Sequence, residues 1–149
     1  MSSRQYHHRA FTLIELLLTV SIIGILATIT IGVMSPRRQL SGSRDVKRQA
    51  DVNAVMSAID QYSIDHGDLP VGIPKGIPKE ICAPAFPHCT GGVDLLMLSG
   101  AYIITIPMDP RAPADGTGSQ YFIVESSNGR LITITAPLAE GNHAISITR

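Results

Sequence analysis

The sequence predicts an α+β fold, in which a long amino-terminal α-helix packs on a small carboxyl-terminal antiparallel β-sheet. Three observations support this fold class. An apolar stretch at residues 11–34 is long enough to cross a membrane as a helix. Residues 44–66 then place apolar side chains at helical spacing. Three short runs with strand-like alternation follow near the carboxyl terminus.

Length and charge limit the classes of protein that need considering. The chain has 149 residues and a formal net charge of +0 at pH 7, which fits one domain of ordinary size. A net charge of zero gives no reason to expect nucleic acid as a partner. Only 5% of the residues are aromatic and Trp is absent, so large stacking platforms are not expected.

The apolar stretch at 11–34 is predicted to be a membrane anchor, because a bilayer core needs about 20 apolar residues in a helix. The alternative is a secretory signal that is removed. Such a signal has an apolar region of only about 7–15 residues followed by a small-residue cleavage site. This run is longer and no Ala-x-Ala site follows it. Neither interpretation accounts for Glu15, an acid near the start of the stretch.

Glu15 is costly in a bilayer unless it has a partner. A carboxylate at the centre of a membrane helix costs about 2.5–3.5 kcal/mol on insertion scales, and less near an end. One interpretation places it at headgroup depth, at little cost. The other gives it a positive partner, which must come from elsewhere because the stretch contains no Lys or Arg. Cleavage between Ala10 and Phe11 would create an α-amino group one helical turn away, and identical helices could then pair charges between neighbours.

The residues around this acid resemble a known family. The short basic leader "MSSRQYHHRA" and the stretch "FTLIELLLTVSIIGILATIT" at 11–30 are similar to the amino-terminal signature of type IV prepilins and pseudopilins. The resemblance implies cleavage before Phe11 by a membrane aspartic prepilin peptidase, N-methylation of Phe11, and filament assembly through Glu15. The family usually has Gly before the cut, where this chain has Ala10. Because Ala is the smallest replacement, we expect processing at a reduced rate.

The resemblance also implies a location. It places a single-pass chain in the cytoplasmic (inner) membrane with an extracytoplasmic head, and a cell-surface or periplasmic filament after assembly. The positive-inside rule argues the opposite way, because more basic residues follow the apolar stretch than precede it. We follow the resemblance, because the leader signature and the later cysteine pair both favour export.

Residues 44–66 read as an amphipathic helix that needs a cover on one face. The apolar stripe consists of Val52, Val55, Met56, Ile59 and Tyr62. The stretch "DVNAVMSAIDQYSIDHGDLP" also resembles the end of the pilin helix.

The ends of this helix and its basic residues carry further expectations. Gly67 is expected to end the helix, and a kink is expected near Pro36. The basic cluster at 37–48 is predicted to be a solvated face near headgroups. The alternative for that cluster is contact with acidic neighbours in a filament.

Residues 68–92 are rich in Pro and Gly and are predicted to form a loop. Cys82 and Cys89 lie within it, in "CAPAFPHC". If the head is exported, a disulfide is expected. Free thiols remain an alternative, as does a metal site with His88, although no fourth ligand has convincing spacing.

Beyond this loop, a short helix at Asp94–Ser99 and three strands are expected. The strands are predicted at Tyr121–Glu125, Leu131–Thr135 and Ala144–Thr148. Asn128-Gly129 indicates a hairpin between the first two. One face of the sheet would then cover residues 52–62 of the helix.

No catalytic pattern emerges, so the chain is not expected to be an enzyme or to hold a cofactor. The five histidines are scattered, and nucleophile elbow, paired zinc motif and phosphate loop are all missing from the sequence. "GTGS" at 116–119 is interpreted as a turn. No metal site is expected, with calcium at the Asp109–Asp115 loop as the alternative, because secretion pseudopilins that this chain resembles can carry calcium nearby.

These observations divide the chain into a leader peptide at 1–10, a transmembrane and assembly helix at 11–35, its amphipathic continuation at 36–67, and a globular head at 68–149. The expected function is that of a structural subunit of a type IV pilus or related filament. One alternative is a type II secretion pseudopilin, although "SSNGRLITITAPLAEG" looks more like a pilin sheet. Another is a membrane-anchored ectodomain that never assembles. Expected partners are other copies of the chain and related pilins, the prepilin peptidase, an inner-membrane assembly platform and membrane lipid.

Overall fold

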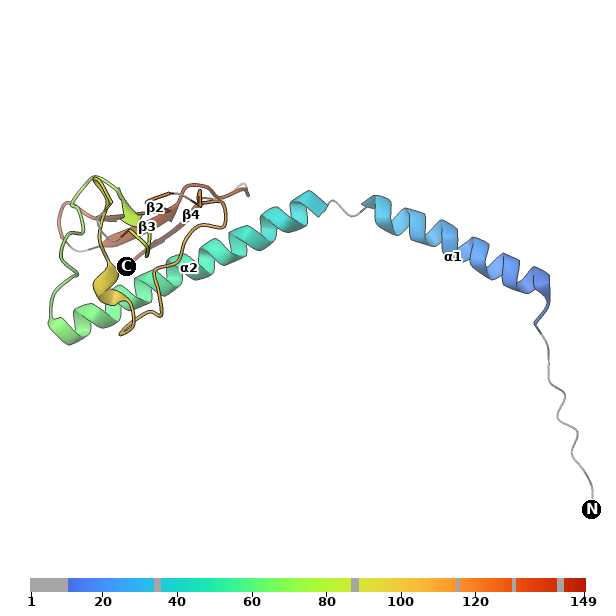
Figure 1. Ribbon diagram of the computed structural model, residues 1–149, viewed down its shortest axis with the longest axis horizontal. Helices are drawn as coiled ribbons and strands as arrows, with labels where there is room; N and C mark the ends of the chain where they lie inside the picture. The colour runs from blue at the N-terminus through green and yellow to red at the C-terminus, as the bar shows by residue number, and fades with distance from the viewer. Residues whose placement is uncertain (1–10, 34–35, 87–88, 115, 130, 142–143) are drawn as a thin grey trace, which may run out of the picture. The chain divides into compact units, whose positions relative to one another are not determined.

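The computed structural model describes residues 11–33, 36–86, 89–114, 116–129, 131–141 and 144–149. Its elements are α1 (Leu13–Val33), α2 (Pro36–His66), β1 (Lys79–Cys82), the 3₁₀ turn η1 (Leu96–Leu98), β2 (Gly118–Glu125), β3 (Ile132–Ala136) and β4 (Ile145–Thr148), as Figure 1 shows. The predicted α+β class is confirmed. The chain divides at Arg37 into two compact units.

The first unit contains α1. The carbonyl oxygen of Thr12 accepts hydrogen bonds from the backbone N–H groups of Glu15 and Leu16, at 3.1 and 3.2 Å, so the helix begins two residues inside the segment predicted at 11–35. The 18-residue window Leu13–Thr30 has a mean hydropathy of 2.3 and none of it is buried, so among the described helices it is the one long and apolar enough to cross a membrane. The kink expected near Pro36 involves residues 34–35, which lie outside the described residues.

The second unit is built on α2, whose predicted apolar stripe is confirmed. Val52, Val55, Met56 and Ile59 are each at most 1% exposed, and the partly buried Tyr62 packs against the same core. The helix ends at His66, and Gly67 follows with a φ of 75°. The Gly67 N–H donates to the carbonyl of Ser63 at 2.8 Å, so the expected glycine terminator is confirmed.

The sheet that covers this stripe has four antiparallel strands in the order β1-β2-β3-β4. Figure 1 shows it lying along one side of α2. The inward positions alternate along the strands, and their apolar members include Tyr121, Ile123, Ile132, Ile134 and Ala136. The three predicted strands are confirmed, although β2 begins three residues earlier, at Gly118. The predicted hairpin joins β2 to β3, with the Ser126 N–H donating to Leu131 O at 2.7 Å.

Three local predictions need correction. Residues 68–92 are not all loop, because Lys79–Cys82 forms β1. Four residues cannot display an alternating pattern, and this strand exists because β2 offers it a partner. The helix expected at Asp94–Ser99 is only the turn Leu96–Leu98. "GTGS" is not simply a turn, because Gly118 and Ser119 begin β2.

Gly118 shows why that strand start was hard to recognise. A Cβ atom at Gly118 would collide with the carboxylate of Glu80 on β1. The same carboxylate accepts the backbone N–H of Gln120 at 2.9 Å, and Gln120 has a φ of 65°, which is unusual for a residue other than glycine. The Glu80 side chain, from β1, therefore stabilises the irregular backbone conformation at the start of β2.

Candidate assembly site

The segment around Phe11 begins an apolar surface that extends along α1. Phe11, Leu13 and Ile14 are each at least 75% exposed. Apolar side chains surround the helix on all sides, which is typical of a helix covered by lipid or by other helices. Ala10, on the other side of the expected cut, lies outside the described residues.

Glu15 is the one charged residue between Leu13 and Thr30, and it lies in the first turn of α1. Its side chain is exposed, and no other side chain in the described part of the chain pairs with it. The helix dipole favours an acid at this end, but it supplies only about 0.3–1 kcal/mol. Placed in a hydrocarbon layer, this carboxylate would need a cation from another molecule.

The two cysteines are joined in a disulfide between Cys82, at the end of β1, and Cys89. Neither is therefore a free thiol. Gly92 lies against the bond, since a Cβ atom at that position would collide with Cys89 Sγ. His88, which the metal alternative required, lies outside the described residues.

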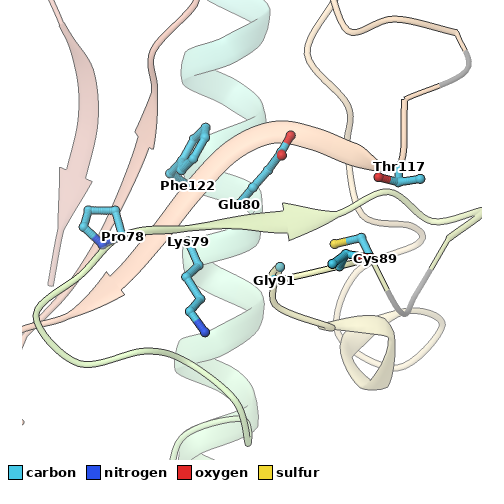
Figure 2. Close-up of a pocket in the computed structure, with 9 residues that line it drawn as sticks. Pro78, Lys79, Glu80, Cys89, Gly91, Thr117 and Phe122 are labelled. Carbon is cyan, nitrogen blue, oxygen red and sulfur yellow. The ribbon is translucent and has the colours of Figure 1, made fainter.

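A cavity of about 270 Å³ opens beside this disulfide. Its lining residues include Pro78, Lys79, Glu80, Thr117 and Phe122. Figure 2 shows Lys79 and Glu80 pointing to opposite sides of β1, so these two groups do not converge on one point. Because Glu80 already accepts the Gln120 N–H, the described lining presents no acid–base pair or ligand set.

A set of charged side chains, here called the charge cluster, ties α2 to two loops of the head. Its members are Arg44, Asp45, Arg48, Asp109 and Glu140. Arg48 donates from Nε to Asp109 Oδ2 at 2.6 Å and from Nη2 to Oδ1 at 3.0 Å, and both side chains are fully buried. The remaining nitrogen of Arg48, Nη1, donates to Asp45 at 2.7 Å and to Glu140 at 3.2 Å.

Arg44 and Arg48 both donate to the carboxylate of Glu140, and the backbone N–H of Glu140 donates to Asp45. Arg44 Nε donates to Glu140 Oε1 at 2.6 Å. Hydrogen bonds from Arg44 and Arg48, together with the charges of Arg44 and Arg111, lower the pKa of Glu140 to about 2. The pKa of Asp45 is also lowered, first because its carboxylate accepts the Glu140 N–H. The β3–β4 connection is thereby fastened to α2 by charge-assisted hydrogen bonds.

The charge cluster corrects the prediction that residues 37–48 form a solvated basic face. Arg38 and Lys47 are exposed, but Arg48 is fully buried and Arg44 is half-buried in an ion pair. The sequence does contain a signal for the burial of Arg48. This residue precedes Val52 by four residues and so lies on the same face of the helix as the buried stripe. Its acidic partners outside α2 could not be predicted from spacing, since Asp109 and Glu140 are 61 and 92 residues away.

In the Asp109–Asp115 loop, the alternative calcium site, the first carboxylate already accepts hydrogen bonds from other residues. The two oxygens of Asp109 accept both Arg48 donors and the Arg111 backbone N–H. Asp115 lies outside the described residues. Among the residues that are described, no group of three or more His, Cys, Asp or Glu side chains could hold a metal ion.

A second acid of α2, Asp51, is partly buried under the sheet. The Tyr121 hydroxyl, on β2, donates to Asp51 Oδ2 at 2.8 Å. Burial raises the pKa of Asp51, and burial together with the neighbouring carboxylate raises that of Tyr121. This contact adds a second polar link between α2 and the sheet.

The fold and the exposed apolar helix together define a class of protein. A membrane-length helix, followed by an amphipathic helix under a four-stranded antiparallel sheet, is the architecture of a pilin-like subunit. The comparisons with known proteins agree with this class. Residues 6–31 match the model of the prokaryotic N-terminal methylation motif.

Curated relatives extend the similarity beyond that motif. The chain is 28% identical over 103 residues to type II secretion system core protein G of Klebsiella pneumoniae, covering 68% of each. It is 27% identical over 116 residues to the protein of the same name from Escherichia coli strain K12, covering 78% of this chain and 71% of the relative. It is 30% identical over 71 residues to competence protein ComGC of Halalkalibacterium halodurans, covering 47% of this chain and 68% of the relative.

No solved structure matches the chain. The motif and the relatives are sufficient for an assignment without one. The chain belongs to the type IV pilin-like family, and it is a pilin-like filament subunit.

Proposed function

We propose that the mature subunit starts at Phe11 and assembles through α1. In this proposal residues 1–10 are a leader, 11–35 the transmembrane and assembly helix, 36–67 its continuation and 68–149 the head. A prepilin peptidase cuts between Ala10 and Phe11, and the new terminus is N-methylated. The match to the methylation motif at residues 6–31 supports this order of events.

Glu15 is the assembly residue in this proposal, and its isolation within α1 is the observation that carries it. The carboxylate is the one charge in a window with a mean hydropathy of 2.3. In a bundle of identical helices, the terminal amine of Phe11 from a neighbouring copy is a cation at a suitable depth. Leaving Glu15 unpaired in the hydrophobic layer is costly, so only the register that pairs these two charges is favoured.

The same proposal assigns location and partners. Before assembly the chain lies in the inner membrane with its head outside, in contact with lipid and with the assembly platform. Afterwards it is part of a filament at the cell surface or in the periplasm, beside other copies and related pilins. The Cys82–Cys89 disulfide supports an extracytoplasmic head, because such bonds persist in oxidising compartments. The role is structural, not catalytic.

Two kinds of filament are candidates. The first is a type IV pilus or a related surface filament. The second is a type II secretion filament, which the relatives named core protein G favour. Mass spectrometry of filaments sheared from the cell surface separates the two. Abundant chains starting at Phe11 support the first, whereas a deletion strain that loses protein secretion, with no surface filaments, supports the second.

The Glu15→Leu substitution tests the assembly mechanism. It removes a polar cost of up to a few kcal/mol, so we expect the variant to enter membranes at least as well as the parent. Filaments should be lost or sparse, because no charge draws the incoming helix into register. Glu15→Gln, which keeps shape but not charge, is the matched control and should also assemble poorly.

Both quantities should be measured in the same cells, as membrane-inserted protein and as filament mass. Normal filaments from Glu15→Leu at a normal protein level would show that the carboxylate has no part in assembly. Intact-mass analysis of the inserted protein checks processing separately. A mature chain that retains residues 1–10 would overturn the proposed cleavage.

A further inference from the structure

The distribution of charge along α2 is the reverse of what a helix prefers. Its first turn contains no acid, and its exposed cations, Arg37, Arg38 and Lys47, lie in its first half. Lys and Arg are absent between Gln49 and His66, and the acid Asp65 lies in the last turn. The helix dipole favours acids at the start and cations at the end. The pattern therefore does not serve the stability of this helix.

Many charges of α2 and of the described part of the head are already paired within the chain. Arg44 and Arg48 form ion pairs within the charge cluster, and Arg149 pairs with Asp60 at 2.6 Å. Arg38 is exposed and has no ion pair within the described residues. Asp65 is also exposed and accepts one hydrogen bond, from the Tyr102 hydroxyl at 3.0 Å, which leaves further lone pairs of the carboxylate open.

The positions of Arg38 and Asp65 on α2 suit a contact between copies. They are 27 residues apart (65 minus 38). At 3.6 residues per turn this is about seven and a half turns and about 40 Å, so the two side chains lie on opposite faces of one helix. Subunits of a filament share one polarity and make heterologous contacts, in which one face meets a different face of the next copy. Opposite charges on opposite faces satisfy that requirement.

We propose that Arg38 of one copy pairs with Asp65 of a neighbouring copy whose α2 is parallel and displaced by about 40 Å along the filament. This inference rests on the proposed function, because it needs parallel copies in one filament. It adds a second point of register, on the head side of the chain, to the one proposed at Glu15. Such exposed pairs select register and partner more than they add affinity, because like charges in a wrong register repel.

Charge reversal tests the pairing in cells that express the full chain. Arg38→Glu and Asp65→Arg should each reduce filament mass by about tenfold, because each places like charges together at every contact along the filament. The double variant, Arg38→Glu with Asp65→Arg, should recover to within about twofold of the parent, because the pair is restored with its signs exchanged.

Matched controls separate the contact from other effects. Lys79→Glu on β1 changes net charge by the same amount as Arg38→Glu at another exposed position, and it should leave filaments unchanged. Tyr102→Phe removes the hydrogen bond to Asp65 without touching the charge, and it should also assemble normally. Membrane-inserted protein, a terminus at Phe11 and protease resistance of the head confirm that each variant is folded and processed.

Cross-linking gives a direct readout. Arg38→Cys combined with Asp65→Cys should produce a ladder of disulfide-linked multimers in oxidised filaments, and neither single variant should. Both native cysteines are already bonded to each other and do not interfere.

Three outcomes would overturn the pairing. They are a double reversal that assembles no better than the single variants, single reversals that leave filaments intact, or a loss that follows Arg38→Glu alone together with reduced membrane association. The last result would assign Arg38 to lipid headgroups. In all three cases the parent still forms filaments, so the proposed function stands. A parent chain that is never found in filaments would instead overturn the proposed function itself.

Discussion

The Nε atom of Arg48 lies 2.6 Å from Oδ2 of Asp109, and neither side chain has any exposed surface. The arginine comes from α2 and the aspartate from the segment between η1 and β2, so this one pair joins parts of the chain 61 residues apart. Its second hydrogen bond, from Nη2 to Oδ1, makes the contact bidentate and fixes the orientation of both groups. The pair therefore fixes the position of that segment against the helix.

Removing Arg48 should destabilise the head strongly. Arg48→Ala leaves Asp109 buried without its charged partner, and breaking a buried pair in this way costs about 3–5 kcal/mol. Thermal or denaturant unfolding of the full chain in detergent, followed by circular dichroism, measures the loss. The matched control is Lys47→Ala, its exposed neighbour on α2, which should change stability by no more than about 0.5 kcal/mol. Equal effects from the two substitutions would contradict the structural role of the pair.

Lowering the pH should reduce the stability of the head, because the carboxylates of the charge cluster become protonated. The pKa of Glu140 is about 2, below its ordinary value of 4.5, so the folded state binds fewer protons than the unfolded state. The stabilisation from Glu140 is therefore complete above pH 4.5 and is lost as the pH falls toward 2. Asp45, whose pKa is also lowered, adds a loss in the same direction.

Glu140→Gln isolates this dependence from other groups. Asp51 has a raised pKa and so opposes the trend, which makes the difference between variant and parent the quantity to measure. Melting temperatures of the full chain should be recorded from neutral pH down to pH 2. The variant should be less stable than the parent at neutral pH, and the gap should close in acid. A gap that stays constant across this range would show that the ionised carboxylate does not act as described.

The disulfide should stabilise the region between β1 and η1. A bond that closes a loop this short contributes about 2–3 kcal/mol in the chain-entropy account. Replacing both Cys82 and Cys89 with Ser should lower the melting temperature accordingly, and a reducing agent should lower that of the parent but not that of the variant. Peptide mapping without reduction should recover the linked peptide. Two alkylatable thiols in the native, exported protein would refute both the bond and the extracytoplasmic location of the head.

Gly92 offers an independent test of the same packing. A Cβ atom at this position would meet Cys89 Sγ and also the backbone carbonyl of Glu80, which cannot move freely. Gly92→Ala should therefore destabilise the parent, with a smaller effect once the cysteines have been replaced by Ser. Additive losses in the two backgrounds would show that the glycine and the disulfide are not in contact.

Processing should depend on the size of residue 10. Since Ala10 stands where the family usually has Gly, we expect Ala10→Gly to be cleaved faster than the parent and Ala10→Val more slowly. Pulse-chase labelling, with mature and precursor chains separated by mass, measures these rates. Equal rates for the three chains would show that residue 10 does not limit cleavage.

The sequence by itself determined the elements whose signals are local. The apolar stretch that becomes α1 is recognised by length and composition, and the stripe on α2 by a spacing of three and four residues. Glu15 stands out in the sequence because one acid is conspicuous in an apolar run, and its role in assembly stays a prediction. Gly67 and the Asn128-Gly129 turn were also predictable, since each reflects a backbone conformation that few residues adopt.

Only the tertiary structure decided the contacts between distant segments. β1 cannot be predicted from its own residues, because a segment of four residues becomes a strand by pairing with β2 and not by its own propensity. The burial of Arg48 was missed for a related reason. An arginine in a basic run is expected to be exposed, and it is buried here because Asp109 and Glu140, from two distant segments, join its helix neighbour Asp45 in binding it. The free energy of such a cluster depends on which groups the fold brings within a few ångströms, and that distance is not written in their spacing along the sequence.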